Sequence, residues 1–143
     1  MRNNLILQPS KFILFGEDDD DDQELLEEVC KEIDDSFDLK FINNGRHIIS
    51  YLEQLDNNEL PCLIVLDYNM PELNGAEILK IIGYNNRYNQ IPKLLWSTSN
   101  ASFYKKQCLE LGAADYLVKP SSLKSFKELV QYMFSFCKQE EKS

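Results

Sequence analysis

The stretch CLIVLDYNMPELNG (residues 62–75) joins an apolar run to an acidic turn. The run CLIVL has no polar residue, which is typical of a strand buried on both faces of a parallel sheet. Asp67 follows it directly, and a Met-Pro pair then begins a turn. Ligands of open α/β sheets bind outside the carboxyl ends of the strands, so Asp67 is a candidate for chemistry.

Other apolar runs and helical segments alternate with this strand. The runs lie at residues 12–15, 37–42, 93–96 and 116–118, and apolar stripes with helical spacing lie at 24–33, 47–55, 74–84, 102–111 and 123–137. Five strand–helix pairs predict an α/β fold with helices on both faces of a parallel sheet. The run FDLKFI (residues 37–42) alternates apolar and polar residues, which predicts an edge strand. The strand order expected is therefore the flavodoxin-like 2-1-3-4-5, in a (βα)5 three-layer sandwich.

The chain of 143 residues suits one domain. We expect an N-terminal extension at 1–10, one domain at 11–137 and a polar tail at 138–143, with no room for a DNA-binding module. No apolar run approaches the roughly 18 residues of a membrane span, and no signal peptide is visible. These observations predict a soluble, cytoplasmic protein.

The net charge of −9 restricts the possible partners. Thirteen of the 24 acidic residues lie between Glu17 and Asp38, which makes one part of the fold strongly negative. Such a surface repels nucleic acid and anionic lipid and attracts cations or basic proteins. The four cysteines, Cys30, Cys62, Cys108 and Cys137, show no CxxC pair, and we expect reduced, mostly buried thiols.

Polar residues follow four of the five predicted strands. They are Glu17, Asp18 and Asp19 after the first strand, Asp67 after the third, Ser97 after the fourth and Lys119 after the fifth. Clustered carboxylates require a cation, and oxygen ligands favour Mg²⁺. An aspartate at a strand end can attack phosphorus and form an acyl phosphate. Lys119 and Ser97 are placed to hold the remaining oxygens of that group.

Four motifs in this order give the chain a family resemblance. FGEDD (residues 15–19), LDYNMPELNG (66–75), STS (97–99) and YLVKP (116–120) each follow a predicted strand. The chain resembles the receiver domain of two-component response regulators, in its CheY-like, stand-alone form, over nearly its whole length. Single motifs of this kind are weak, but together they are highly specific.

The resemblance implies a role for each matching residue. Asp67 is the expected phosphoacceptor, Ser97 the switch hydroxyl, Tyr116 the aromatic residue whose rotamer reports phosphorylation, and Lys119 the phosphate-contacting lysine, with a cis peptide bond before Pro120. Mg²⁺, with Mn²⁺ or Ca²⁺ as substitutes, is expected on Asp19 directly, on Asp18 mainly through water, on Asp67, and on the backbone carbonyl of Asn69.

The same resemblance implies a signalling role. A sensor histidine kinase or a phosphotransfer protein would donate the phosphoryl group, and the surface of the fourth helix, fifth strand and fifth helix would bind a protein target. The protein would catalyse its own phosphorylation and slow hydrolysis, but it would not be a turnover enzyme. We expect a monomer or a phosphorylation-linked dimer.

Several residues raise further questions. Thr98 and Trp96 are larger than expected beside the pocket, and Asn69 and Ser99 occupy positions that tune dephosphorylation in the family. Asp20, Asp21 and Asp22 are interpreted as a helix start, where acidic side chains suit free N–H groups and the helix dipole. Two other functions stay open. One is a phosphohydrolase of the haloacid dehalogenase kind, which has a second Asp where this chain has Asn69, and the other is a pseudo-receiver that only binds protein.

Overall fold

A computed structural model describes residues 11–98 and 102–137. The predicted extension at 1–10, the tail at 138–143 and Ser99 lie outside the described residues. The strands form one parallel sheet of order β2-β1-β3-β4-β5, which confirms the predicted flavodoxin-like order. The elements are β1 (Phe12–Gly16), α1 (Asp20–Ile33), β2 (Asp38–Ile42), α2 (Gly45–Glu53), η1 (Asn57–Glu59), β3 (Leu63–Asp67), α3 (Gly75–Gly83), η2 (Asn86–Tyr88), β4 (Lys93–Ser97), α4 (Ser102–Glu110), β5 (Asp115–Val118) and α5 (Leu123–Ser135).

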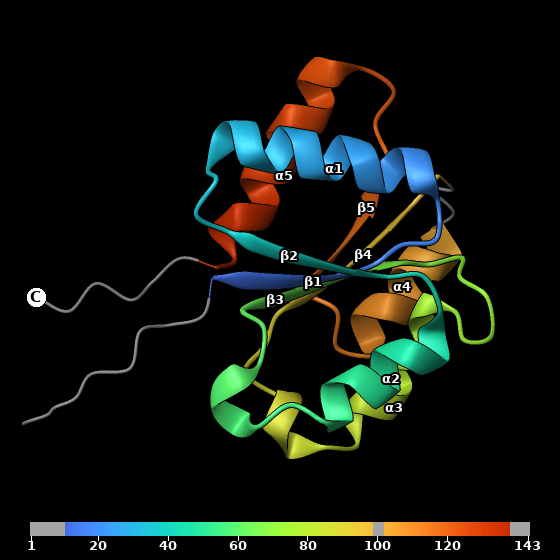
Figure 1. Cartoon of the computed structure of the whole chain (residues 1–143). Coiled ribbons are helices and arrows are strands. Elements are labelled where there is room, and N and C mark those ends of the chain that lie inside the picture. The colour runs from blue at the N-terminus through green and yellow to red at the C-terminus, as the bar shows by residue number, and fades with distance from the viewer. Residues whose placement is uncertain (1–10, 99–101, 138–143) are drawn as a thin grey trace, which may run out of the picture.

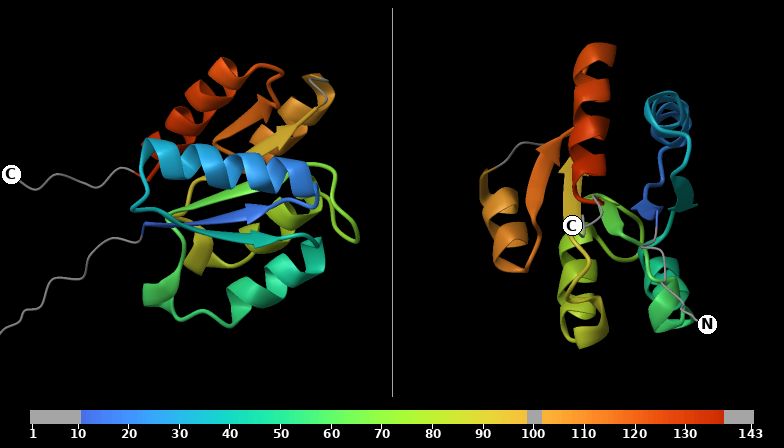
Figure 2. Two further views of the ribbon diagram at one scale, coloured as in Figure 1. Left: turned by 45° about the horizontal axis from the view of Figure 1, so that its top comes forward. Right: turned by 90° about the vertical axis from the view of Figure 1, so that its left-hand side faces the viewer.

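Helices cover both faces of the sheet. Helices α1 and α5 pack on one face, and α2, α3 and α4 pack on the other, as the two views in Figure 2 show. Each face has its own apolar cluster, one centred on Phe15, Val65 and Trp96, the other on Leu14, Leu66 and Leu95. Successive side chains of a strand point to opposite faces, so each inner strand contributes to both clusters. The sheet and the helices on its two faces therefore form three layers (Figure 1).

The burial of the strands agrees with the sequence pattern. All five residues of β3 are buried, as expected for a central strand. In β2 every residue is at least partly exposed, because this strand forms one edge of the sheet. The alternation of polar and apolar residues in FDLKFI therefore identified the edge correctly.

Helix α1 begins inside the acidic run. Asp19 has extended backbone angles, and its side chain accepts a hydrogen bond from the Asp22 N–H at 2.9 Å, so Asp19 is the N-cap. Asp20, Asp21 and Asp22 form the first turn, where negative charge interacts favourably with the helix dipole. The predicted helix start is confirmed, but the cap is Asp19, which was expected to be a cation ligand.

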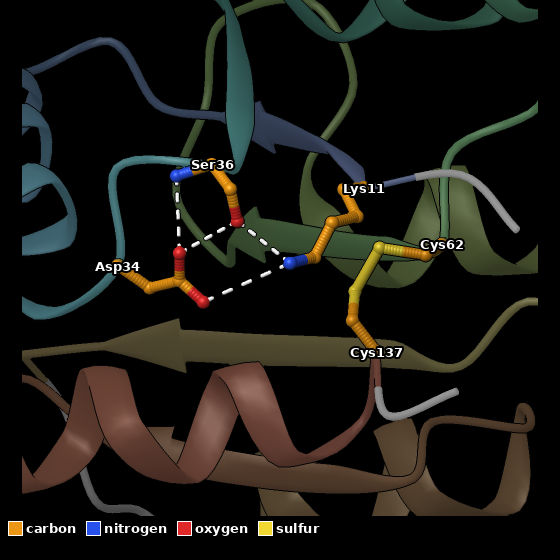
Figure 3. Close-up of a disulfide and its surroundings, with 5 residues drawn as sticks. All are labelled: Lys11, Asp34, Ser36, Cys62 and Cys137. Atoms are coloured by element: carbon orange, nitrogen blue, oxygen red, sulfur yellow. Dashed lines mark hydrogen bonds and ion pairs between the residues drawn. A yellow bond between two sulfur atoms is a disulfide. The ribbon is translucent and has the colours of Figure 1, made fainter. Parts of the chain in front are cut away.

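A disulfide joins Cys62, just before β3, to Cys137, just after α5. The expectation of four reduced thiols is therefore wrong for this pair, whereas Cys30 and Cys108 are free and buried. The two cysteines are 75 residues apart in sequence, so their spacing gave no sign of a pair. They meet because α5 runs antiparallel to the strands and ends beside the start of β3, with Cα atoms 5.3 Å apart (Figure 3).

In residues 11–98 and 102–137, no helix combines the length and the apolar character needed to cross a bilayer.

Candidate functional site

Three carboxylates converge at the carboxyl ends of β1 and β3. These neighbouring strands are in register, with Gly16 opposite Leu66, so the residues that follow them lie side by side. Oxygen atoms of Glu17, Asp18 and Asp67 all lie within 4.8 Å of one another. Glu17 and Asp67 are buried and Asp18 is exposed. We call these three residues the acid group.

Lys119 places one positive charge against this group. Its Nζ lies 2.7 Å from Asp67 Oδ2, 2.8 Å from Asp22 Oδ2 and 3.2 Å from Glu17 Oε1. Burial lowers the pKa of Lys119, but these carboxylates outweigh burial and hold its pKa above the usual value. The lysine is therefore charged at neutral pH, and it cannot balance the surrounding acids alone.

Glu17 is the member of the acid group whose negative charge is most disfavoured by its surroundings. Burial, and then the charge of Asp67, raise the pKa of Glu17 from 4.5 to about 8. Its Oε2 accepts a hydrogen bond from the Asp19 N–H at 3.0 Å, whereas its fully buried Oε1 accepts none. The charged neighbour of this oxygen is the Lys119 ammonium at 3.2 Å, which Glu17 shares with Asp67 and Asp22, so the negative charge is only partly balanced. This oxygen, in an oxygen-only donor set, fits a hard divalent cation such as Mg²⁺.

Asp19 is not part of the acid group. Its side chain caps α1, and the structure brings Glu17 into the position that the sequence analysis gave to the acidic pair Asp18 and Asp19. The signal that identifies Glu17 is its place directly after β1, since that strand ends at Gly16. We therefore propose Glu17, Asp18 and Asp67 as the side-chain ligands of the cation, in place of the expected set Asp18, Asp19 and Asp67.

The carboxylate of Asp67 is fixed at both oxygens. Oδ1 accepts a hydrogen bond from the Asn69 N–H at 2.9 Å, and Oδ2 accepts one from Lys119. Helix α3 begins at Gly75, close to the backbone of Asp67 and Tyr68, and this close approach is possible because glycine has no side chain. A Cβ there would lie 2.3 Å from Leu95 Cδ1 and 3.1 Å from the Tyr68 Cα. Asn69 thus orients Asp67 through its N–H, and a metal role for its carbonyl stays a proposal.

Ser97 and Tyr116 lie together on neighbouring strands. Ser97 is fully buried at the end of β4, and its carbonyl accepts a hydrogen bond from the Lys119 N–H at 2.8 Å. Burial raises the pKa of Tyr116, and a side-chain hydrogen bond with Ser97 opposes that change. The Tyr116 ring is buried and lies against Tyr68, with centroids 6.4 Å apart. The two predicted switch residues are thus in contact.

Two features beside Lys119 differ from expectation. The Lys119–Pro120 peptide bond is trans, since no cis bond occurs among the described residues, and Lys119 reaches the acid group without one. Trp96 is fully buried between the sheet and α5, with the Lys119 ammonium 4.6 Å from its ring centre. Trp96, expected to be large for its position, thus packs inside the fold beside Lys119, and Asp22 is a partner of Lys119 that the sequence did not indicate. Thr98 is exposed.

The sequence matches a known family over most of its length. The profile of the response regulator receiver domain covers residues 13–131. Response regulator Rcp1 of Synechocystis sp. is 33% identical over 131 residues, which cover 90% of this chain and 89% of Rcp1. Chemotaxis protein CheY1 of Helicobacter pylori is 26% identical over 111 residues, covering 78% of this chain and 90% of CheY1.

Solved structures show the same similarity. The phosphorylated cyanobacterial phytochrome response regulator RcpA superposes with a TM-score of 0.80 at 25% identity, covering 89% of this chain and 93% of RcpA. The Mn²⁺-bound form of Rcp1 superposes with a TM-score of 0.76 at 32% identity, covering 87% of this chain and 92% of Rcp1. The profile match, the relatives and the fold agree: this chain belongs to the response regulator receiver domain family of two-component signalling.

Proposed function

We propose that this receiver domain accepts a phosphoryl group on Asp67 from a histidine kinase or a phosphotransfer protein. One observation supports this above all: Asp67 shares one edge of the sheet with Glu17, Asp18 and Lys119, within direct contact distance. In the transfer, a carboxylate oxygen of Asp67 bonds to phosphorus as the phosphorus–nitrogen bond of the donor's phosphohistidine breaks. The product is an acyl phosphate, which hydrolysis returns to the free carboxylate.

A divalent cation fits the acid group, and we propose Mg²⁺, with Mn²⁺ or Ca²⁺ as substitutes. The Mn²⁺-bound form of Rcp1 supports this assignment, as do the oxygen-only donors and Glu17 Oε1, which is buried and accepts no hydrogen bond. When bound, such a cation neutralises charge on the transferring group. A cytoplasmic location would supply both Mg²⁺ and the phosphorylated donor, and it forms part of the proposal.

The chain's own residues perform the rest. The Asn69 N–H fixes the Asp67 carboxylate, and the Lys119 ammonium beside it can hold a phosphoryl oxygen. The Ser97 hydroxyl can donate to another oxygen, and this would rearrange the side-chain hydrogen bond that it shares with Tyr116. Both contacts use the same hydroxyl, so phosphorylation would be coupled to the position of the Tyr116 ring.

The surface that responds would be the one formed by α4, β5 and α5. Exposed apolar side chains lie on each of these elements, including Phe103 on α4, Val118 on β5 and Leu123 on α5. Tyr116 lies within β5, so a change in its packing acts directly on this surface. We propose that a protein target binds there, and that the protein is a monomer or a phosphorylation-linked dimer.

Acetyl phosphate tests the proposal without knowledge of the kinase. The wild-type protein, incubated with acetyl phosphate and Mg²⁺, should gain one phosphoryl group in intact-mass spectra, and it should gain none in EDTA. Asp67→Asn should gain none under either condition. Asp35→Asn is the matched control, because it removes an exposed carboxylate far from the site, and it should behave as wild type.

Two outcomes would redirect the assignment. A wild-type protein that gains no phosphoryl group with Mg²⁺ present favours a binding-only pseudo-receiver. Steady turnover of p-nitrophenyl phosphate would favour a phosphohydrolase. The exposed Asn69, at the place where that enzyme class has an acid, makes turnover unexpected.

A further inference from the structure

Lys119 has four close neighbours, and they fall into two pairs. Glu17 and Asp67 belong to the acid group. Asp22 and the Trp96 ring do not belong to it. Lys119 Nζ lies 2.8 Å from Asp22 Oδ2 and 4.6 Å from the Trp96 ring centre. The second pair lies outside the acid group, so both of its members can hold the ammonium when a cation shares the oxygens of the acid group.

A divalent cation on the acid group repels the Lys119 ammonium, because like charges a few ångströms apart oppose each other in a partly buried site. Lysine also has a flexible four-carbon stem, which loses entropy when its end is fixed. Contacts outside the acid group are therefore needed to hold Lys119 beside Asp67 during transfer.

Asp22 is well placed for this task. Its backbone is fixed by the N-cap, because its N–H donates to Asp19 Oδ1 at 2.9 Å. Its side chain is 28% exposed and faces Lys119 from the first turn of α1. The other acids of that turn, Asp20 and Asp21, are exposed and form no ion pair with Lys119. The acidic run therefore contributes one specific partner as well as general negative charge.

Trp96 holds the other side of the ammonium. The side chain is fully buried and packs edge-on against Phe126, with ring centroids 6.0 Å apart, so its position is set by packing. Its Nε1–H is buried without a hydrogen-bond partner in the described structure, an arrangement that is costly for an indole. Tryptophan has the best cation–π face of the aromatic residues, and the attraction is stronger when the ammonium is partly desolvated, as it is here. This contact gives a reason for tryptophan at a position where an aliphatic residue would fill the space.

We infer that Asp22 and Trp96 are positioning residues that hold the Lys119 ammonium at the phosphoryl site while a cation occupies the acid group. The inference rests on the proposed function. It assigns two residues, neither of which touches the phosphoryl group, to control of the lysine that does.

The first test measures the rate of phosphorylation by acetyl phosphate at saturating Mg²⁺. Asp22→Asn should lower the rate about tenfold, since misplacement of a catalytic group by about 1 Å has effects of this order or larger. The Mg²⁺ dissociation constant should change less than about threefold, because Asp22 lies outside the acid group. Asp21→Asn removes the same charge one residue earlier and should keep the wild-type rate.

A Lys119→Met background separates positioning from structure. Asp22→Asn should have no further effect on the rate in that background, because its action passes through Lys119. An equal loss with and without Lys119 would show a purely structural role. A single Asp22→Asn variant as fast as wild type would overturn the inference and leave the proposed function intact, whereas an unreactive wild-type protein would overturn both.

Trp96 allows a second readout, because it is the only tryptophan in the chain. Its emission should change in Lys119→Met and stay unchanged in Asp21→Asn, whether or not phosphoryl transfer occurs. Trp96→Phe keeps an aromatic face and should stay within about threefold of the wild-type rate, whereas Trp96→Leu should lose about tenfold. Identical emission with and without Lys119 would rule out the contact, even if Trp96→Leu fails to fold.

Discussion

Charged side chains have opposite environments at the two ends of the parallel strands, which we call the carboxyl edge and the amino edge of the sheet. At the carboxyl edge, Glu17 and Asp67 are buried around the single ammonium of Lys119, and one carboxylate oxygen accepts no hydrogen bond. At the amino edge, Lys11 Nζ donates to Ser36 Oγ at 2.6 Å beside Asp34, and Arg87 donates to the backbone carbonyls of Leu52 and Leu55. The Cys62–Cys137 disulfide also lies at the amino edge (Figure 3).

Two carboxyl groups summarise this difference. Burial raises the pKa of Glu17 to about 8, whereas hydrogen bonds from the Ser36 side chain and N–H lower the pKa of Asp34 below its usual value. Folding therefore disfavours the charge of Glu17 and favours that of Asp34. At the carboxyl edge the buried charge of Glu17 opposes folding, whereas at the amino edge satisfied hydrogen bonds and a covalent link favour it.

The largest effect should come from breaking the disulfide at the amino edge. The bond closes a loop across 75 residues of sequence, for which the chain-entropy model gives about 4.5 kcal/mol. Dithiothreitol should lower the free energy of unfolding by roughly this amount in urea titrations. The double variant Cys62→Ser/Cys137→Ser should have the reduced stability already and should not respond to dithiothreitol. Equal stability with and without the bond would contradict the role of this edge.

The next effect concerns the burial of Glu17. Between about pH 4.5 and 8, folded Glu17 keeps a proton that the unfolded chain has lost, so the stability of the cation-free protein should fall as pH rises. The slope is at most about 1.4 kcal/mol per pH unit. In EDTA, Glu17→Gln should remove this slope and stabilise the protein at pH 8 by about 2 kcal/mol. Urea titrations at several pH values measure both quantities.

The same variant should fail to bind Mg²⁺ tightly, which links the lost stability to function. Mg²⁺ should raise the melting temperature of wild type and have little effect on Glu17→Gln, because a ligand of the folded state alone stabilises that state. A Glu17→Gln protein that is less stable than wild type in EDTA at pH 8 would show that the buried charge is not a liability.

A smaller effect should come from Glu72, in the loop between β3 and α3 at the carboxyl edge. Its φ of 71° lies in the left-handed region, which costs a residue with a Cβ about 1 kcal/mol. Glu72→Gly should therefore stabilise the protein by about 0.5–1 kcal/mol, even after the exposed Arg46–Glu72 ion pair is lost. Glu72→Gln is the control, since it removes the ion pair but keeps the backbone strain, and it should not stabilise.

The smallest effect should appear at Asp34. Its lowered pKa favours the folded state above the unfolded pKa, and this contribution is lost as pH falls through the folded pKa. Ser36→Ala removes the hydroxyl donor and should move the Asp34 pKa up towards its usual value, as measured by NMR titration of the carboxyl group. Lys11→Met should move it less, because the Lys11–Asp34 distance of 3.8 Å makes a weak, exposed pair. A larger change of the Asp34 pKa in Lys11→Met than in Ser36→Ala would show that the charge of Lys11 matters more than the Ser36 hydrogen bond.

Most of the fold could be predicted because it depends on local patterns. The unbroken apolar run before Asp67 indicated a central strand, and the alternation in FDLKFI indicated an edge, so the strand order followed. The acidic run was harder, since identical aspartates give no pattern that separates a cap from a ligand. The end of β1 at Gly16 and the cap at Asp19 make this distinction, and they place Glu17 in the acid group.

The sequence alone determined the alternation of strands and helices, the edge at which polar residues collect, and the place of Asp67 and Lys119 there. These features follow from hydrophobic periodicity and from the parallel direction of the strands, which are local or topological properties. Only the tertiary structure decided which acid is buried, which residues hold Lys119, and that Cys62 meets Cys137. Contacts of this kind form when side chains from distant segments pack within a few ångströms of one another. The spacing of residues in the sequence does not indicate which of them will meet.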